Sequence, residues 1–160
     1  MDNRFAEDEV VSHNDRRTKS VNISLAKEIF DHIDTETEVV AIDEVQFLDE
    51  EAVNIITHLA DQGIRVIVSG LDKDFRGETF SFMPKLTALA EYVTKLTAIC
   101  VKCGDPATRT QRIVNGKPAK YNDPIVLIGA EESYEARCRK CHKVYRKPNY
   151  YKGRIKKASE

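Results

Sequence analysis

Residues Val39 to Asp49 read VVAIDEVQFLD, an apolar and β-branched run that ends at two adjacent carboxylates, Asp43 and Glu44. Such a run predicts a buried strand followed by an exposed polar tip. Ligands of open α/β sheets bind at the carboxyl ends of strands, so we expect both acids to project into a crevice, with Gln46 and Phe47 just behind them. One acid of such a pair can hold a metal ion while its neighbour accepts a proton. Acidic residues also end many strands for solubility alone, and that alternative stays open here.

The chain on either side of this run alternates between helix and strand patterns. A helix is expected to begin at Asp49 to Glu51, because acidic side chains stabilise the positive N-terminal end of a helix. Gly63 is expected to end this helix. The segment IRVIVS at Ile64–Ser69 predicts a second buried strand, and the alternation predicts an α/β fold with a parallel sheet. The other expected elements are a loop-like stretch over residues 1–20, a short strand over Val21–Ile23, a helix from Ser24 to about Ile33, a helix from Pro84 and a last sheet strand over Val93–Ile99. After Cys100 we expect short β runs with turns at Asn115-Gly116 and Asn122-Asp123-Pro124.

Charge is distributed unevenly, although the net charge is only −1. Residues 1–50 carry 5 basic and 14 acidic side chains, whereas residues 100–160 carry 15 basic and 6 acidic ones. A basic end can mark nucleic-acid binding, but these residues are not interleaved with stacking aromatics. The pattern therefore favours the alternative, a solvated basic tail formed by residues 146–160. The chain has no run of 18 apolar residues and does not open with a signal peptide, so neither a membrane nor secretion is expected.

The four cysteines form two Cys-x-x-Cys pairs, Cys100/Cys103 and Cys138/Cys141, separated by 34 residues. Each pair can grip one ion from one side, and together they complete a tetrahedral four-sulfur site that leaves no position for water. We therefore expect a structural zinc ion in a reducing, cytoplasmic compartment. His142 is a possible substitute ligand, and a redox role for the cysteines is the other alternative. The composition change at Cys100 predicts an α/β domain over residues 1–99, a zinc-binding β domain over residues 100–145 and a disordered tail.

Four segments, IDEVQF, GLDKDFRG, KLTAICVKCG and IGAEESYEARC, together resemble the type II thymidine kinases in order and spacing. The resemblance covers about residues 1–145. It implies a P-loop NTPase-like parallel sheet joined to a small zinc-ribbon-like domain. It also implies transfer of the γ-phosphate of ATP, bound with Mg²⁺, to the 5′-hydroxyl of thymidine. A cytosolic homotetramer with thymidine triphosphate as feedback inhibitor is expected on the same ground.

The resemblance assigns roles to the residues around the acidic strand end. Asp43 resembles the family's acid that holds magnesium through water, and Glu44 its general base toward the thymidine 5′-hydroxyl. A positioned carboxylate suits that proton transfer, because phosphoryl transfer otherwise needs mainly positioning and charge neutralisation. Gln46 would lie near the phosphates. Asp2 and Arg4 resemble an Asp-x-Arg segment that places the arginine near the transferred phosphate.

The resemblance also outlines a nucleoside pocket. Phe47, Leu71 and Phe75 would form walls around thymine, although ordinary core packing is the simpler interpretation of these residues without the family. Thr110 would lie by the methyl group of the base, and Tyr134 would close the pocket. The remaining residues form a lasso loop whose main-chain groups read the polar edge of thymine: Ile125, Val126, Leu127, Ile128 and Gly129.

One element of the family pattern is missing from the sequence. None of the seven glycines gives the phosphate-loop pattern G-x-x-x-x-G-K-[ST], so we expect an N-terminally truncated thymidine kinase whose 160 residues alone are inactive. Without the loop and the central strand, the apolar faces of Val39–Ile42 and Ile64–Val68 would be exposed. The alternatives are a nucleoside-binding regulator without catalysis and a zinc-ribbon protein that binds nucleic acid, the latter with salt-sensitive affinity.

Overall fold

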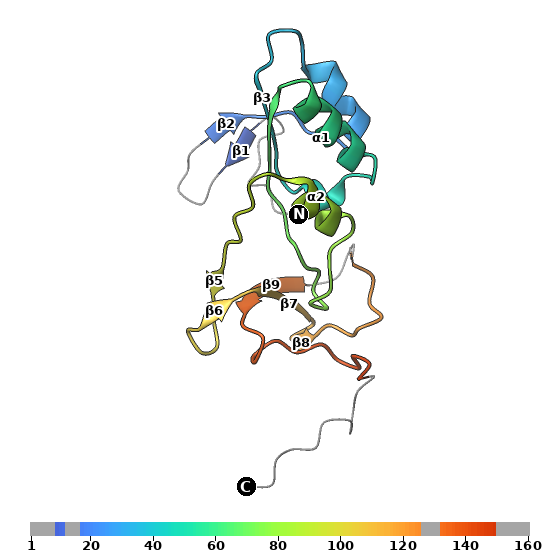
Figure 1. Cartoon of the computed structure of the whole chain (residues 1–160). Coiled ribbons are helices and arrows are strands. Elements are labelled where there is room, and N and C mark those ends of the chain that lie inside the picture. Colours follow the sequence, from blue (N-terminus) through green and yellow to red (C-terminus); the bar gives the residue numbers. More distant parts are fainter. Residues whose placement is uncertain (1–8, 12–16, 126–131, 150–160) are drawn as a thin grey trace, which may run out of the picture. The chain divides into compact units, whose positions relative to one another are not determined.

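The computed structural model describes residues 9–11, 17–125 and 132–149 (Figure 1). The chain divides into two compact units, Met1–Gly70 and Leu71–Glu160. Each unit combines helices with short sheets, which makes the protein a mixed α/β chain as expected. The predicted division into residues 1–99, 100–145 and 146–160 stays a prediction. Among the described residues, every helix is too short or too polar to cross a bilayer.

The first unit is built on a strand–helix–strand succession. Strands β3 (Val39–Ile42) and β4 (Arg65–Val68) pair in parallel, with helix α1 (Ala52–Asp61) between them in the chain. Helix α1 buries an apolar stripe, and the left-handed turn at Gly63 (φ +87°) ends it as expected, because glycine adopts that conformation without a steric penalty. The sequence therefore predicted the parallel pairing correctly.

The prediction that these strands are buried is wrong for one of their two faces. Along β3 only Ile42 is buried, and Val39 is 54% exposed; in β4 Ile67 is 52% exposed. Residues alternate between the two faces of a strand, so one face of the two-stranded sheet packs inward while the other stays open. Apolar side chains of both strands are thus exposed on that face.

The N-terminal part of the first unit also differs from the expectation. Strands β1 (Glu9–Val11) and β2 (Arg17–Lys19) pair antiparallel within the stretch expected to be a loop, and Val21–Ile23 forms no strand. The expected helix after Ser24 is the 3-10 helix η1 (Ala26–His32). Its start is capped by the carboxylate of Glu28, which accepts hydrogen bonds from the backbone N–H groups of Ser24 (2.8 Å) and Leu25 (3.3 Å).

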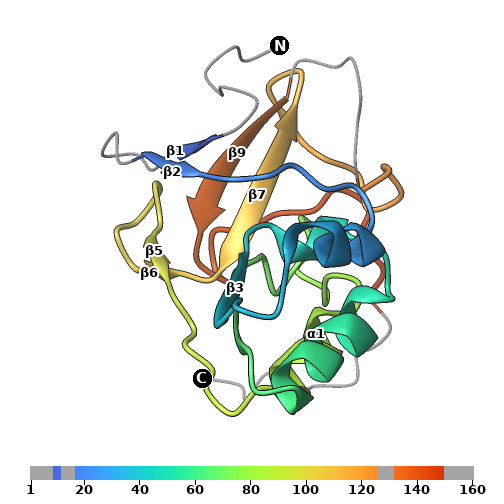
Figure 2. The ribbon, with the colours of Figure 1, turned by 90° about the horizontal axis from the view of Figure 1, so that it is seen from above.

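The second unit is organised around the long strand β7 (Arg109–Val114). It pairs antiparallel with β9 (Glu132–Arg137) over six residues, and Figure 2 shows the two strands side by side. On its other edge β7 pairs with β8 (Lys117–Pro118) through the expected turn at Asn115-Gly116, where both residues have positive φ. Helix α2 (Met83–Leu89) begins one residue before the expected Pro84.

The expected last strand of the parallel sheet is not formed. Only β5 (Ala98–Ile99) is a strand, and it pairs antiparallel with β6 (Pro106–Ala107). The reason is local: the backbone N–H of Cys100 donates to the carbonyl of Asp105 at 2.8 Å, which turns the chain back on itself immediately after β5. The first cysteine pair therefore decides the partner of this strand.

Candidate functional site

The acidic strand end lies where β3 stops, beside the end of β4. Ser69 follows β4; its backbone N–H donates to the carbonyl of Ile42 (2.9 Å), and its carbonyl accepts from the N–H of Val45 (3.1 Å). The Ser69 hydroxyl donates to Asp43 Oδ1, which also accepts the Glu44 N–H at 2.9 Å. One oxygen of the Asp43 carboxylate thus has two donors that fix its orientation. Sequence reasoning missed Ser69, although its position at the end of the neighbouring strand was a usable signal.

Glu44 adopts a left-handed backbone conformation, with φ 51° and ψ 36°. This conformation costs a residue with a side chain about 1 kcal/mol or more, and such strain is concentrated at functional sites. The buried amide of Gln46 donates a hydrogen bond to Glu44 Oε2, and therefore holds the carboxylate. The turn η2 (Val45–Phe47) follows, and Phe47 is 57% exposed.

The structure therefore brings Asp43, Glu44 and Gln46 together at the acidic strand end, and their functional roles stay a prediction. Phe47 lies next to them in the chain but is not a core residue of this unit, since more than half of it is exposed. Asp2 and Arg4 lie outside the described residues.

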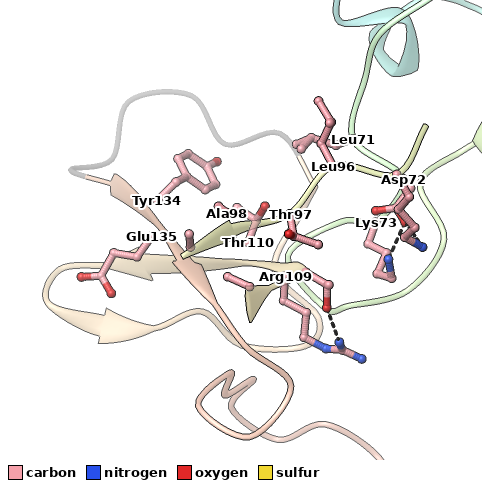
Figure 3. A pocket seen from close by; sticks show the side chains of 14 residues that line it. Leu71, Asp72, Lys73, Leu96, Thr97, Ala98, Arg109, Thr110, Tyr134 and Glu135 are labelled. Atoms are coloured by element: carbon pink, nitrogen blue, oxygen red, sulfur yellow. Dashed lines mark hydrogen bonds and ion pairs between the residues drawn. The ribbon is translucent and has the colours of Figure 1, made fainter. Parts of the chain in front are cut away.

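A cavity of about 400 Å³ lies within the second unit. Three of its lining residues, Leu71, Thr110 and Tyr134, are those that the sequence assigned to a nucleoside pocket. They come from the start of the unit, from β7 and from β9 (Figure 3). The complete lining is Leu71, Asp72, Lys73, Lys95, Leu96, Thr97, Ala98, Ala107, Thr108, Arg109, Thr110, Tyr134, Glu135 and Ala136.

The polar side of this cavity is a charge cluster around Asp72. Its Oδ2 lies 2.5 Å from Lys73 Nζ and 2.7 Å from Lys95 Nζ. Burial raises the pKa of Asp72, but the hydrogen bonds and charges of the two lysines outweigh burial and lower it overall. Asp72 therefore stays ionised at neutral pH and neutralises part of the lysine charge.

Phe75 does not line the cavity; it is 5% exposed and lies near two guanidinium groups. The Cζ of Arg76 lies 5.2 Å from the ring centroid, and that of Arg112 lies 5.1 Å from it. Ile125 is 38% exposed. The other expected loop residues, Val126 to Gly129, lie outside the described residues.

The four cysteines form the cluster that their spacing predicted. All four sulfur atoms lie within 4.8 Å of one another, and Cys103 Sγ and Cys138 Sγ are 3.6 Å apart. A tetrahedral zinc ion with bonds of about 2.3 Å places its sulfur ligands about 3.8 Å apart, so the donor set and its spacing fit structural zinc. Cys100 and Cys138 are buried, whereas Cys103 is exposed.

Backbone groups shape both cysteine turns, and those around Cys100 favour its thiolate. The N–H of Gly104 donates to the Cys100 carbonyl at 2.9 Å, and the N–H of Cys141 donates to the Cys138 carbonyl at 3.2 Å. Burial raises the pKa of the Cys100 thiol, but hydrogen bonds, chiefly from backbone N–H groups, lower it to about 6. His142 does not belong to the cluster: its Nε2 lies 2.8 Å from the Phe75 carbonyl oxygen.

Comparison with known protein families gives the family of this chain. The family model described as thymidine kinase matches residues 1–142 of the 160-residue chain. The chain therefore belongs to the thymidine kinase family.

Proposed function

We propose that the chain carries the nucleoside pocket and the catalytic acids of a thymidine kinase, which transfers the γ-phosphate of ATP to the 5′-hydroxyl of thymidine. One observation carries the proposal. Leu71, Thr110 and Tyr134, which are far apart in the chain, line one cavity of a size typical for small-molecule sites. Family membership supports the reaction class, a phosphotransferase acting on a nucleoside.

In this proposal the cavity binds the thymine base. Leu71 supplies an apolar wall, Thr110 contacts the methyl group of the base, and Tyr134 offers an aromatic face on which the base stacks. Ile125 begins the main-chain segment that reads the polar edge of thymine, with Val126 to Gly129 continuing it. Phe75 does not line the cavity, and in this proposal it serves as a buried ring beside the guanidinium groups of Arg76 and Arg112.

The acids of the first unit supply the chemistry in this proposal. Glu44 accepts the proton of the 5′-hydroxyl, and the hydrogen bond from Gln46 holds its carboxylate for that role. Asp43 is the acid for Mg²⁺–ATP, and a single carboxylate suits an ion that keeps several of its waters. When bound, the ion neutralises charge on the phosphates. We further propose a P-loop NTPase-like sheet, a homotetramer, feedback by thymidine triphosphate and a cytoplasmic location, all from family membership alone.

Isothermal calorimetry with thymidine tests the proposal at the pocket, using the zinc-loaded full chain. Tyr134→Ala should weaken binding about tenfold or more, because stacking on an aromatic side chain contributes about 1–3 kcal/mol per base. Tyr145→Ala is the matched control, since Tyr145 is similarly exposed (59% against 52%) but does not line the cavity. No thymidine binding by the unsubstituted chain, or equal losses in both variants, would contradict the proposal.

A further inference from the structure

We propose that Arg112 is a positioning residue for nucleoside recognition, because its buried guanidinium holds the Phe75 ring and the Pro124–Ile125 backbone in fixed places. The inference rests on the proposed function, in which Phe75 and Ile125 serve the nucleoside pocket. Sequence reasoning gave Arg112 no role.

Arg112 is the largest side chain that is completely buried among the described residues. Its Nη1 donates to the carbonyl oxygens of Pro124 (2.6 Å) and Ile125 (3.3 Å). Its Cζ lies 5.1 Å from the centroid of the Phe75 ring. A guanidinium can donate hydrogen bonds and contact an aromatic ring at the same time, because its donors lie in the plane of the group while its face is available to the ring. One side chain therefore joins two segments separated by about fifty residues.

The strand register adds the remaining pocket residues to this arrangement. Arg112 stands directly opposite Tyr134 in the β7–β9 pair, and Thr110 lies two positions before it on β7. Residues that face each other across a pair, and residues two apart in a strand, share one face of the sheet. Arg112 thus lies on the face that carries Thr110 and Tyr134, and it contacts the Phe75 ring and Ile125 from that face.

The chemistry of this position favours positioning over simple space filling. Burying a charged group is costly, and an apolar side chain of similar size fills an interior at least as favourably. Methionine cannot donate to two successive carbonyl groups, however, and lysine has no planar face for an aromatic ring. The directional contacts of Arg112 are therefore the property that an arginine alone provides here.

The backbone around Phe75 is held independently of Arg112. The Phe75 carbonyl oxygen lies 2.8 Å from His142 Nε2, and Asp74 Oδ1 accepts the N–H groups of Arg76 (2.9 Å) and Glu78 (3.1 Å). Replacing Arg112 should therefore loosen the Phe75 ring and the Ile125 backbone without unfolding this loop. That separation makes a positioning role distinguishable from a general structural one.

The test compares Arg112→Lys with Arg137→Lys in the zinc-loaded full chain. Arg137 is a matched control: it is 7% exposed, lies on β9 and pairs with Glu135 in its own strand. Calorimetry with thymidine gives two separate quantities: the affinity, and, from the stoichiometry, the fraction of chains that are able to bind. We expect Arg112→Lys to weaken thymidine affinity at least tenfold at unchanged stoichiometry, and Arg137→Lys to change it less than twofold. A lower stoichiometry with unchanged affinity in Arg112→Lys would overturn the inference.

Hydrogen exchange without nucleoside tests the same contacts independently of binding. Just before Pro124, the N–H groups of Tyr121 and Asp123 donate to the carbonyls of Tyr145 (2.8 Å) and Lys120 (3.0 Å). These two amides should exchange faster in Arg112→Lys, but at the original rate in Arg137→Lys. If the unsubstituted chain binds no thymidine, the proposed function fails, while unchanged exchange in Arg112→Lys overturns the inference itself. If Arg112→Lys does not fold, Phe75→Leu replaces it. This variant keeps an apolar side chain but removes the ring that Arg112 contacts, and unchanged thymidine affinity in it is the overturning result.

Discussion

Removing the zinc ion that fits the cysteine cluster should unfold the region around the two cysteine turns. The apolar interior at this place is small: Cys100, Ala107 and Cys138 are buried, with Ala136 and Cys141 packed against them. Side chains of this size contribute roughly 1 kcal/mol each on burial, or about 3 kcal/mol for the three buried ones. Zinc bound to a structural site contributes about 10–16 kcal/mol. The metal therefore dominates the stability of this region.

Two measurements check this prediction. Metal analysis of the purified chain should give roughly one zinc ion per chain, and a chelator should then abolish the slow exchange of the Val101 N–H, which donates to the Ala136 carbonyl at 3.1 Å. Cys138→Ser should lose the ion, whereas His142→Asn should retain it, because His142 lies outside the sulfur cluster. Retention of zinc by Cys138→Ser, or an unchanged exchange rate after complete chelation, would refute the reasoning.

Three further predictions concern activity and stability. The 160-residue polypeptide alone should not phosphorylate thymidine with Mg²⁺–ATP, because its glycines give no phosphate-loop pattern; turnover above background in a radiolabel assay contradicts this. Glu44→Gly should raise the free energy of unfolding by about 1 kcal/mol through relief of the left-handed backbone, whereas Glu51→Gly, at an ordinary φ of −62°, should give no gain in denaturant titrations. Leu59→Ala should cost about 3 kcal/mol, and Leu89→Ala, at 55% exposure, less than about 0.5 kcal/mol.

Local patterns in the sequence predicted the elements that depend on neighbouring residues. Periodicity and turn chemistry within short stretches of sequence were enough to predict three features: helix α1, the parallel pairing of β3 and β4, and the Asn115-Gly116 turn. The cysteine spacing likewise predicted a four-sulfur cluster, because two short pairs can meet around one ion whatever the chain between them does.

Elements that depend on distant partners were predicted poorly. The segment Val93–Ile99 has the pattern of a sheet strand, yet only Ala98–Ile99 pairs, and its partner is β6. A pattern of alternating side chains shows that a segment can pair, but it does not identify the partner. The two strands near the N-terminus were missed for the opposite reason: Glu9–Val11 and Arg17–Lys19 are only three residues long, which is too short to give a strand signal.

Residues of the candidate pocket also differ in whether the sequence alone identifies them or whether their distant contacts must be known. Thr110 and Tyr134 can be assigned from motifs because each would touch a ligand, and the register of β7 and β9 then puts them on one face of the second unit. Arg112 occurs between them on that face but would touch no ligand, so motif reasoning has no reason to select it. Its role becomes visible only through burial and through the carbonyl groups that it binds. A polar residue placed mid-strand between two assigned pocket positions is therefore the signal by which such positioning residues can be found.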